Sequence, residues 1–447
     1  MSGALPTAFA GPVLGVDGCC AGLPVNPRKD SDMASDRHLE PWALVILTTI
    51  VIFPIASGLE LLRLPGVLIG AFAAYILVLG ALRRPELGWR IAFPLVLFTG
   101  AALISALNSS NMVSVIGRAG VFGSLVLVTA SAAYRYPVKA SCRWCFIWIP
   151  SGISLIALVL SLVDPSNAYL KSESGISRLS IPLVYLHPNT LGVLAVTGLV
   201  ATFMYRRLFT DRSLLFVGVL AINTSVLLLS GSRSALVDLV AGAFVIGFLR
   251  RAALRRLFMF CLVVLVLLLF ARNGLQGAVL RGQETSQFAK LSGRIPIWEA
   301  AGRAIRSAPV TGVGYSNGAR EALEGTDISL SYSVSTSDNV FIDALLECGV
   351  LGLIAICMVA GRVARLLARS RQLVNPSVDL LVCCAVAAMV LVHSLTSSGL
   401  IRFSPLLAEL VLSLVLGFRE LASLSARHVF AGNHEGSAPH THSWERL

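Results

Sequence analysis

The sequence predicts an all-α polytopic membrane protein with about twelve transmembrane helices, both termini in the cytoplasm, and one long periplasmic loop with short helices. Hydrophobic residues make up 55% of the 447 positions and charged residues only 13%, whereas soluble proteins average about 25% charged residues. Long apolar runs recur along the chain, and the segments between them alternate regularly between rich and poor in basic residues.

Twelve apolar runs approach the length needed to cross a bilayer, which is about 20 residues. They lie near residues 42–60, 65–82, 91–107, 113–133, 145–163, 181–204, 213–230, 234–249, 257–271, 340–361, 378–397 and 403–418. The predicted organisation is a disordered cytoplasmic tail (1–41), helices 1–9 (42–271), a long periplasmic loop (272–339), helices 10–12 (340–418) and a cytoplasmic tail (419–447).

The N-terminal 41 residues are rich in Gly, Pro, Ala and Asp and lack the basic start and apolar core of a secretory signal peptide. They indicate a disordered cytoplasmic tail or an over-long start assignment, with Met33 as the alternative start. Six of the nine cysteines lie in or beside apolar runs, where a thiol behaves as a small apolar group. Cys142 and Cys145 form a CxxC without a second pair to complete a zinc site, so no metal or cofactor is indicated.

The distribution of Lys and Arg predicts the orientation, because basic residues collect in cytoplasmic loops. With the N-terminus inside, every inner segment holds three or four of them, whereas the short outer loops together hold five. Long loops cross regardless of charge, so the 272–339 loop does not disturb this count. Topology therefore explains the net charge of +12, and we expect no nucleic-acid partner, since no soluble basic domain is present to bind one.

Four features that are distant in the sequence fall on the predicted outer side. The first is "RLSIPLVYLHPNTLG", which places Arg178 at the outer end of the sixth helix and His187, Pro188 and Asn189 about two turns further in. A proline at that depth breaks the helical hydrogen-bond ladder, and Asn189 can satisfy the freed backbone groups. His187 suits the same structural role or a contact with a substrate.

The second feature is "LLLSGSRSALV", in which Arg233 and its neighbour Ser232 stand between two long apolar runs. An arginine so near hydrocarbon is costly unless it is needed, although a snorkelling side chain is the structural alternative. The third is "SGRIPIWEAAGRAIRSAP", followed by the glycine-rich "TGVGYSNG", and it predicts a short amphipathic helix ended by a proline. It carries Arg294 and Trp298, and the indole suits an interfacial anchor or a substrate contact.

The fourth feature is "STSDNVFIDALLECGVLGL", which leads through Asp338 and Asn339 into the tenth helix. Arginines gathered at an outer membrane interface suit a phosphate, because a guanidinium stays charged and binds phosphate in a fork. A lipid pyrophosphate lies at that depth, and arginines around it would stabilise the charge that develops if it leaves. No P-loop or dinucleotide fingerprint is present in the sequence.

These four stretches, in this order and spacing, resemble the O-antigen ligase and O-antigen polymerase superfamily over about residues 170 to 415. The resemblance implies a mostly helical, lipid-dependent membrane glycosyltransferase. Such an enzyme takes a glycan from undecaprenyl pyrophosphate and inverts the anomeric carbon without a metal. It also implies that Arg233 and Arg294 bind the pyrophosphate, with Arg178 as a less certain match.

Asp338 is the position where this chain departs from the ligase pattern. The ligases look to have His-Asn where this chain has Asp338-Asn339, and that histidine is proposed to help activate the acceptor. Polymerase-like members tolerate Asp there. An aspartate can take a proton from a sugar hydroxyl when it is correctly placed, and it is also a preferred N-cap for the tenth helix. One residue can fill both roles.

The leading hypothesis is a polymerase in the bacterial inner membrane that joins undecaprenyl-pyrophosphate-linked oligosaccharide repeats at the periplasmic face into an exopolysaccharide, capsule or O-antigen. Arg233 and Arg294 would hold the donor pyrophosphate, and Asp338 would orient or deprotonate the acceptor hydroxyl. The other candidate substrate-binding residues are Arg178, His187, Asn189, Ser232, Trp298 and Asn339. The expected partners are the lipid-linked oligosaccharide, membrane lipid, and a chain-length regulator and a flippase of the same pathway.

Two other functions stay open at this point. A ligase would transfer finished polymer to lipid A core, and Asp338 in place of His is the feature against it. A transporter of lipid-linked sugar would use charges buried in the helices. The charges that could serve it are Arg118, Asp238, Glu347, His393 and Glu409. Against this function, no inverted repeat relates the two halves of the chain.

Overall fold

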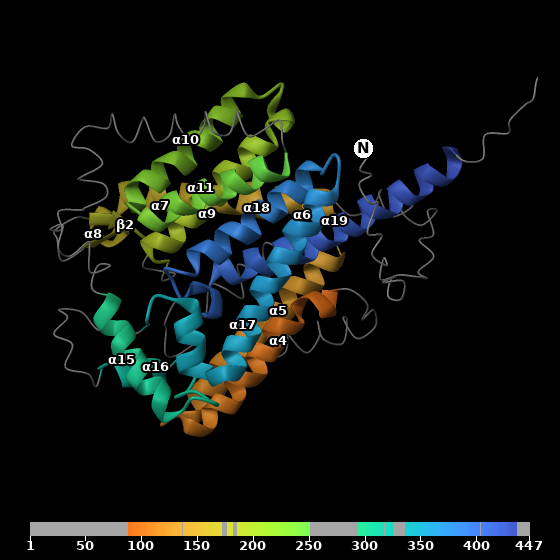
Figure 1. Cartoon of the computed structure of the whole chain (residues 1–447). Helices are drawn as coiled ribbons and strands as arrows, with labels where there is room; N and C mark the ends of the chain where they lie inside the picture. The colour runs from red at the N-terminus through yellow and green to blue at the C-terminus, as the bar shows by residue number, and fades with distance from the viewer. Residues whose placement is uncertain are drawn as a thin grey trace, which may run out of the picture. The chain divides into compact units, whose positions relative to one another are not determined.

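The computed structural model describes residues 88–135, 137–171, 177–181, 186–250, 294–316, 318–324, 336–402 and 404–435. Over these residues the protein is mostly helical, as predicted, and its only sheet there is a two-stranded antiparallel hairpin (Figure 1). The N-terminal tail and the spans expected near 42–60, 65–82 and 257–271 lie outside the described residues.

The helices carry the labels of Figure 1. They are α4 (Gly88–Ser105), α5 (Met112–Arg135), α6 (Val138–Arg143), the π-helical turn η3 (Trp144–Trp148), α7 (Ile149–Val163), α8 (Pro165–Ala168), α9 (Pro188–Met204), the 3₁₀ turn η5 (Arg206–Phe209), α10 (Ser213–Ser230), α11 (Arg233–Leu249), α15 (Arg294–Ser307), α16 (Gly318–Glu324), α17 (Val340–Gln372), α18 (Val378–His393), the 3₁₀ turn η7 (Gly399–Ile401) and α19 (Pro405–Glu435). A further 3₁₀ turn, η2, is Ala106–Asn108, and the strands are β1 (Tyr169–Lys171) and β2 (Ser177–Leu179).

Several helices have the length and apolar composition of membrane spans. Among the described residues, four segments are long and apolar enough to cross a bilayer: Ile91–Asn108, Val138–Val163, Ser213–Ser230 and Val340–Gln372. The apolar helices Met112–Leu127, Pro188–Met204 and Val378–His393 are shorter. The chain is therefore a helical membrane protein, while the total of twelve spans and the orientation of the termini stay predictions.

Several helix boundaries differ from the sequence prediction. Helix α17 continues to Gln372 instead of ending near residue 361. The sixth expected span was to begin at residue 181, but α9 begins at Pro188. Proline is favoured in the first turn of a helix, where its missing N–H has no intrahelical partner to lose. The last helix, α19, continues to Glu435 instead of ending near residue 418, so part of the expected C-terminal tail is helical.

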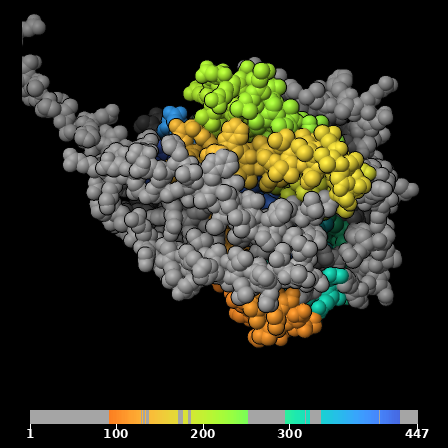
Figure 2. Space-filling view, turned by 180° about the vertical axis from the view of Figure 1, so that it is seen from behind, coloured from red at the N-terminus to blue at the C-terminus, as the bar shows by residue number. Residues whose placement is uncertain are grey.

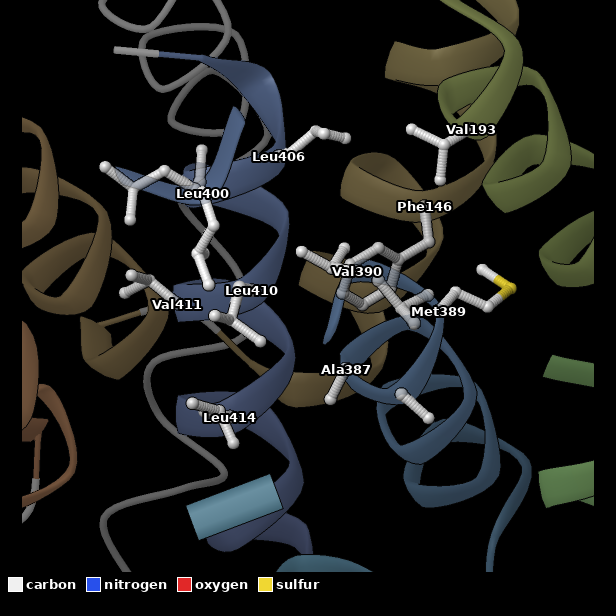
Figure 3. Close-up of a cluster of buried hydrophobic side chains, with 14 of the residues drawn as sticks. Phe146, Val193, Ala387, Met389, Val390, Leu400, Leu406, Leu410, Val411 and Leu414 are labelled. Carbon is white, nitrogen blue, oxygen red and sulfur yellow. The ribbon is translucent and has the colours of Figure 1, made fainter. Parts of the chain in front are cut away.

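Small residues let the central helices approach closely, as is common where membrane helices pack. A Cβ on Gly192 of α9 would lie 2.7 Å from the Cβ of Ser232, at the start of α11. A Cβ on Gly242 of α11 would lie 2.4 Å from the sulfur of Met389 on α18. Figure 3 shows Met389 in the same buried cluster as Phe146 of η3 and the leucines of α19. These contacts fix α9, α11 and α18 against one another.

The remaining described helices pack around this centre. Helix α10 contacts both α9 and α7, and Figure 2 shows the yellow α7 segment beside the yellow-green α10 on one face. Buried Asn223 of α10 donates to Ser151 Oγ and accepts from Ser154 Oγ of α7, at 2.8 and 3.0 Å. Interhelical hydrogen bonds of this kind hold helices together where apolar contacts give no preference over lipid. Helices α4 and α5 pair with each other, and α4 also packs along α17.

Candidate active site

Arg178 is built into the hairpin that precedes α9. The sequence placed it at the outer end of a helix, which is wrong: Arg178 lies on β2, paired with Leu170 of β1. Its side chain is 8% exposed and turns toward the helices. Nε donates to the carbonyl of Ser230 at 2.9 Å, and Nη2 donates to Asn189 Oδ1 at 2.6 Å. Arg178 therefore ties the end of α10 to the start of α9.

His187 and Asn189 form the N-terminus of α9 and do not interrupt it. His187 is the N-cap, with Nδ1 accepting from the Asn189 N–H at 3.2 Å. Pro188 occupies the first turn, so the expected break in the hydrogen-bond ladder does not occur. Asn189 binds Arg178 and does not bond to freed backbone groups. His187 thus has a structural role, but it acts as a helix cap and not at a break within a helix.

Arg233 is the first residue of α11, directly after the tight turn that joins it to α10. Gly231 has a φ of 54° in this turn, a left-handed conformation that glycine adopts without strain. Ser232 is 2% exposed and caps α11 by accepting from the Ala235 N–H at 3.2 Å. Arg233 thus stands at the positive end of the helix dipole, where a cation gains nothing and an anion is favoured.

Charge–charge effects connect the three predicted arginines. Burial and then the positive charge of Arg233 lower the pKa of the Arg178 guanidinium to about 10. Arg233 precedes the apolar run of α11, and its pKa is lowered by burial and then by the charge of Arg294. The three side chains therefore form a row in which Arg233 raises the cost of charging Arg178, and Arg294 raises the cost of charging Arg233. A bound anion would relieve that cost, because an opposite charge favours the protonated form.

Helix α15 confirms the short amphipathic helix predicted in the long loop, and it begins at Arg294. Arg294 Nη2 donates to the carbonyl of Thr396 at 3.0 Å and lies 3.4 Å from Asp338 Oδ2. Trp298 Nε1 donates to the carbonyl of Ser337 at 2.9 Å. Both side chains hold α15 against the 336–339 turn, beside α17 (Figure 1). The indole is thus a structural contact within the protein; a contact with substrate stays a prediction.

Asp338 is not the cap of α17, which is one of the two roles that the sequence left open. The cap is Asn339, whose Oδ1 accepts from the N–H groups of Phe341 and Ile342 at 3.0 and 3.2 Å. Asp338 has a φ of 55°, in the left-handed region that Asp and Asn visit more often than other side chains. Its side chain is 48% exposed. The carboxylate is left beside Arg294, and its Oδ1 accepts from Thr336 Oγ1 at 3.1 Å.

Neighbouring helix ends hold this turn in ways that the sequence did not reveal. The Val340 N–H donates to the Ser394 carbonyl at 2.9 Å, just past the end of α18, and Asn339 Nδ2 donates to the Leu395 carbonyl at 3.2 Å. Buried Asp343, one turn into α17, accepts from the Ser337 N–H at 2.8 Å. Every residue has a backbone carbonyl, so the sequence does not indicate which carbonyls accept these hydrogen bonds. Only the three-dimensional structure identifies them.

A second feature missed by the sequence analysis is the break in α17 at Gly349. This residue has φ 65° and ψ −162°, a conformation almost restricted to glycine. The predicted glycine-rich turn lies against the break. Val313 and Gly314 donate to the carbonyls of Leu346 and Glu347 at 2.9 and 3.2 Å, and Val350 donates to the Pro309 carbonyl at 3.0 Å. The turn thus satisfies the backbone groups that the break leaves open.

Glu347 at the same break is fully buried and forms an ion pair with Arg402. Its other oxygen accepts from the Ser316 N–H at 3.0 Å. Burial lowers the pKa of the Arg402 guanidinium, but the carboxylates of Glu347 and Asp343 outweigh it, so the pKa is raised overall. Arg402 is one of the five basic residues of the predicted short outer loops. Its ion pair with Glu347 therefore stabilises the broken part of α17.

The predicted site residues fall into two groups that meet at Arg233 and Arg294. One group is Arg178, His187, Asn189, Ser232 and Arg233, at the starts of α9 and α11. The other is Arg294, Trp298, Asp338 and Asn339, at the starts of α15 and α17. Four helix N-termini therefore supply the site, and helix N-termini are favourable surroundings for phosphate. The arrangement suits an anion flanked by one half-exposed carboxylate.

These features define a helical membrane protein with a cationic site built from helix N-termini. A sequence model of the family described as O-antigen ligase matches residues 216–357, which confirms the resemblance to the O-antigen ligase and O-antigen polymerase superfamily. The matched segment contains Arg233, Arg294, Trp298, Asp338 and Asn339, whereas Arg178, His187 and Asn189 precede it. No protein with a curated description matches the chain significantly. The match indicates an O-antigen ligase or polymerase type of function.

Proposed function

We propose that the protein is a glycan polymerase that joins oligosaccharide repeats carried on undecaprenyl pyrophosphate. The observation that carries this proposal is the half-exposed Asp338 carboxylate, 3.4 Å from Arg294 and free of the helix-capping role. A carboxylate next to a phosphate-binding guanidinium places a proton acceptor beside the leaving group. The reaction is that of an inverting glycosyltransferase without a metal, taking place at the periplasmic face of a bacterial inner membrane.

The donor pyrophosphate would lie between Arg233 and Arg294. Both arginines begin helices, so the helix dipoles add to their positive charge, each by about 0.3–1 kcal/mol at an exposed site. The half-buried surroundings strengthen such interactions relative to water. Arg178 is held by Ser230 and Asn189 and would act mainly by keeping the cationic row in place. The charge of the leaving pyrophosphate would thus meet groups that are already oriented.

The chemical step is a single displacement. The acceptor hydroxyl oxygen attacks the anomeric carbon of the donor, a new glycosidic bond forms, and the bond from that carbon to the pyrophosphate oxygen breaks with inversion. Asp338 takes the hydroxyl proton, and undecaprenyl pyrophosphate leaves with the electron pair. General-base assistance of this type contributes about 10²- to 10⁴-fold to a rate.

Ligation of finished polymer to lipid A core is the second candidate, and the family description favours it. Asp338 favours polymerisation, because ligases of the superfamily are expected to have histidine at this place. A transporter is less well supported. All five charged side chains that it would use have partners within the protein: Asp238 with His393, Glu347 with Arg402, Glu409 with Thr197 Oγ1, and Arg118 with Ser316 Oγ. A polymerase would also work with a flippase and a chain-length regulator of the same pathway.

A deletion strain tests the proposal. Its surface glycan is sized on a gel and its undecaprenyl-linked intermediates are labelled, with Arg233→Ala and wild-type genes reintroduced at equal protein levels. A polymerase predicts loss of long chains with single repeats left on lipid, restored by wild type but not by Arg233→Ala. Long chains stranded on undecaprenyl pyrophosphate would identify the ligase instead, and unchanged glycans in the Arg233→Ala strain would exclude both.

A further inference from the structure

Asp238 and His393 form a buried pair on the helices that lead into the candidate active site. Asp238 Oδ2 lies 2.8 Å from His393 Nδ1, and both side chains are 1% exposed. The pair joins α11 to α18, which pack against each other along their length. Neither Asp238 Oδ1 nor His393 Nε2 has a hydrogen-bond partner among the described residues, so one directional bond connects the two side chains.

The two residues stand close to opposite halves of the site. Asp238 follows Arg233 by five residues on α11, a rise of about 7.5 Å along the helix axis. His393 is the last residue of α18, and the chain then enters the 394–396 turn. Thr396 holds that turn, because its N–H and Oγ1 both donate to the His393 carbonyl, at 2.9 and 3.1 Å.

The 394–396 turn supplies the backbone carbonyls that position the second half of the site. The carbonyl of Ser394 accepts from Val340 and that of Leu395 accepts from the Asn339 side chain. The carbonyl of Thr396 accepts from Arg294 Nη2 at 3.0 Å. A continuous series of contacts therefore runs from Arg233 along α11 to Asp238, across to His393, and through the turn to Arg294.

We propose that Asp238 and His393 are positioning residues that set the separation of Arg233 from the Arg294–Asp338 pair. The inference rests on the proposed function, since that function requires both arginines on one pyrophosphate. A buried hydrogen-bonded pair contributes little net stability compared with two apolar residues of similar shape. Unlike apolar contacts, however, a hydrogen bond fixes the rotation and register of α11 against α18. A shift of about 1 Å at reacting groups can lower a rate by about 100-fold, so this register bears directly on catalysis.

The test uses the full chain in lipid nanodiscs with an undecaprenyl-pyrophosphate-linked repeat unit, measuring kcat and KM separately. The decisive variant replaces the pair by leucines, Asp238→Leu with His393→Leu, because replacing both partners of a buried hydrogen bond by apolar groups can leave stability nearly unchanged or raise it. We expect a folded protein whose kcat falls roughly 10- to 100-fold. The single changes Asp238→Asn and His393→Asn keep a hydrogen bond across the interface and are expected to recover most of kcat.

Glu409→Leu is the matched control. Glu409 is another buried carboxylate, and it accepts from Thr197 Oγ1 at 3.1 Å between α19 and α9. Its replacement is expected to leave kcat within about twofold, as for independent sites. Wild-type kcat in the double-leucine variant would overturn the inference, and so would an equal loss in the control.

A distance measurement keeps the inference separate from the proposed function. Nitroxide labels are placed at Val237→Cys on α11 and Arg303→Cys on α15, both exposed positions, in a chain with its other cysteines replaced. Spin–spin distances are then compared with and without the Asp238–His393 pair. A broadened or shifted distribution in the double-leucine variant supports positioning even if the wild-type protein proves to make no glycan. An unchanged distribution refutes positioning even if the wild-type protein is an active polymerase.

Discussion

Replacing Asp338 by asparagine separates the chemistry of the carboxylate from the architecture of the turn. Asparagine has nearly the same shape, and it tolerates the left-handed φ of 55° about as well as aspartate. The ion pair with Arg294 is lost, but Asp338 is 48% exposed, so solvent screening limits that loss to about 1 kcal/mol or less. Arg294 keeps its bond to the Thr396 carbonyl. The unfolding free energy should therefore change little.

The rate should change much more than the stability. If Asp338 accepts the proton of the acceptor hydroxyl, Asp338→Asn lowers kcat by about 10²- to 10⁴-fold. The assay is single-turnover transfer from a purified lipid-linked repeat unit, with thermal unfolding measured on the same sample. A variant with wild-type kcat would refute the role of the carboxylate, whatever its stability.

Asn339→Ala is the control for the same turn, and it should lower the stability more and the rate less than Asp338→Asn does. It removes the cap of α17, with its bonds to Phe341 and Ile342, and the bond to the Leu395 carbonyl. Loss of an N-cap costs about 0.5–2 kcal/mol. We expect a clear fall in melting temperature and a smaller fall in kcat than for Asp338→Asn. Equal losses of kcat in both variants would mean that the turn, and not the carboxylate, determines the rate.

Three further predictions concern the cationic row and the break in α17. Arg233→Lys should bind undecaprenyl pyrophosphate measurably more weakly than wild type in a lipid-binding assay, because an ammonium cannot form the two-pronged contact; equal affinity would contradict the assignment. The pKa of Arg178 is lowered to about 10, so the side chain is charged at neutral pH and binding of the same lipid should weaken as the pH rises through 10. The Kd measured as a function of pH tests this. Arg178→Leu should abolish the loss of affinity near pH 10, and a loss that persists in this variant would show that another group is responsible. Gly349→Ala should destabilise the protein by about 3 kcal/mol or more, since the added Cβ would lie 2.1 Å from the Val310 carbonyl oxygen, and thermal unfolding with wild-type stability would contradict this.

The helical membrane class, the amphipathic helix in the loop and the family followed from local patterns that the sequence carries. Apolar runs, the helical spacing of "RIPIWEAAGRAIRSAP" and the ordered motifs are readable without the fold. The break of α17 was not predicted, because Gly349 is one glycine among 38 and its conformation depends on the 309–314 turn packed against it. Tertiary contacts, and not helix propensity, decide that break.

The candidate site shows the same division. Arg233 stood out because charge next to apolar segments is costly, so its presence indicated function. The resemblance to the superfamily pointed to Arg294 and Asp338. The geometry of these residues could not be predicted from the sequence. The hairpin that carries Arg178 lies in the segment before the expected sixth span, where no strand was predicted, and His187 caps a helix that was expected to pass through it. The sequence offered Asp338 as a possible cap of the tenth helix, and the fold assigned that role to Asn339.

Reconstitution tests the central claim most directly. Purified protein in nanodiscs is given a single undecaprenyl-pyrophosphate-linked repeat unit as both donor and acceptor, beside matched preparations of Arg233→Ala and Arg294→Ala with the same melting temperature. The account predicts a ladder of glycans of increasing length from the wild-type protein, with undecaprenyl pyrophosphate released at each addition, and no ladder from either variant. An unchanged repeat unit with folded wild-type protein, or a ladder of equal yield from the arginine variants, would contradict it.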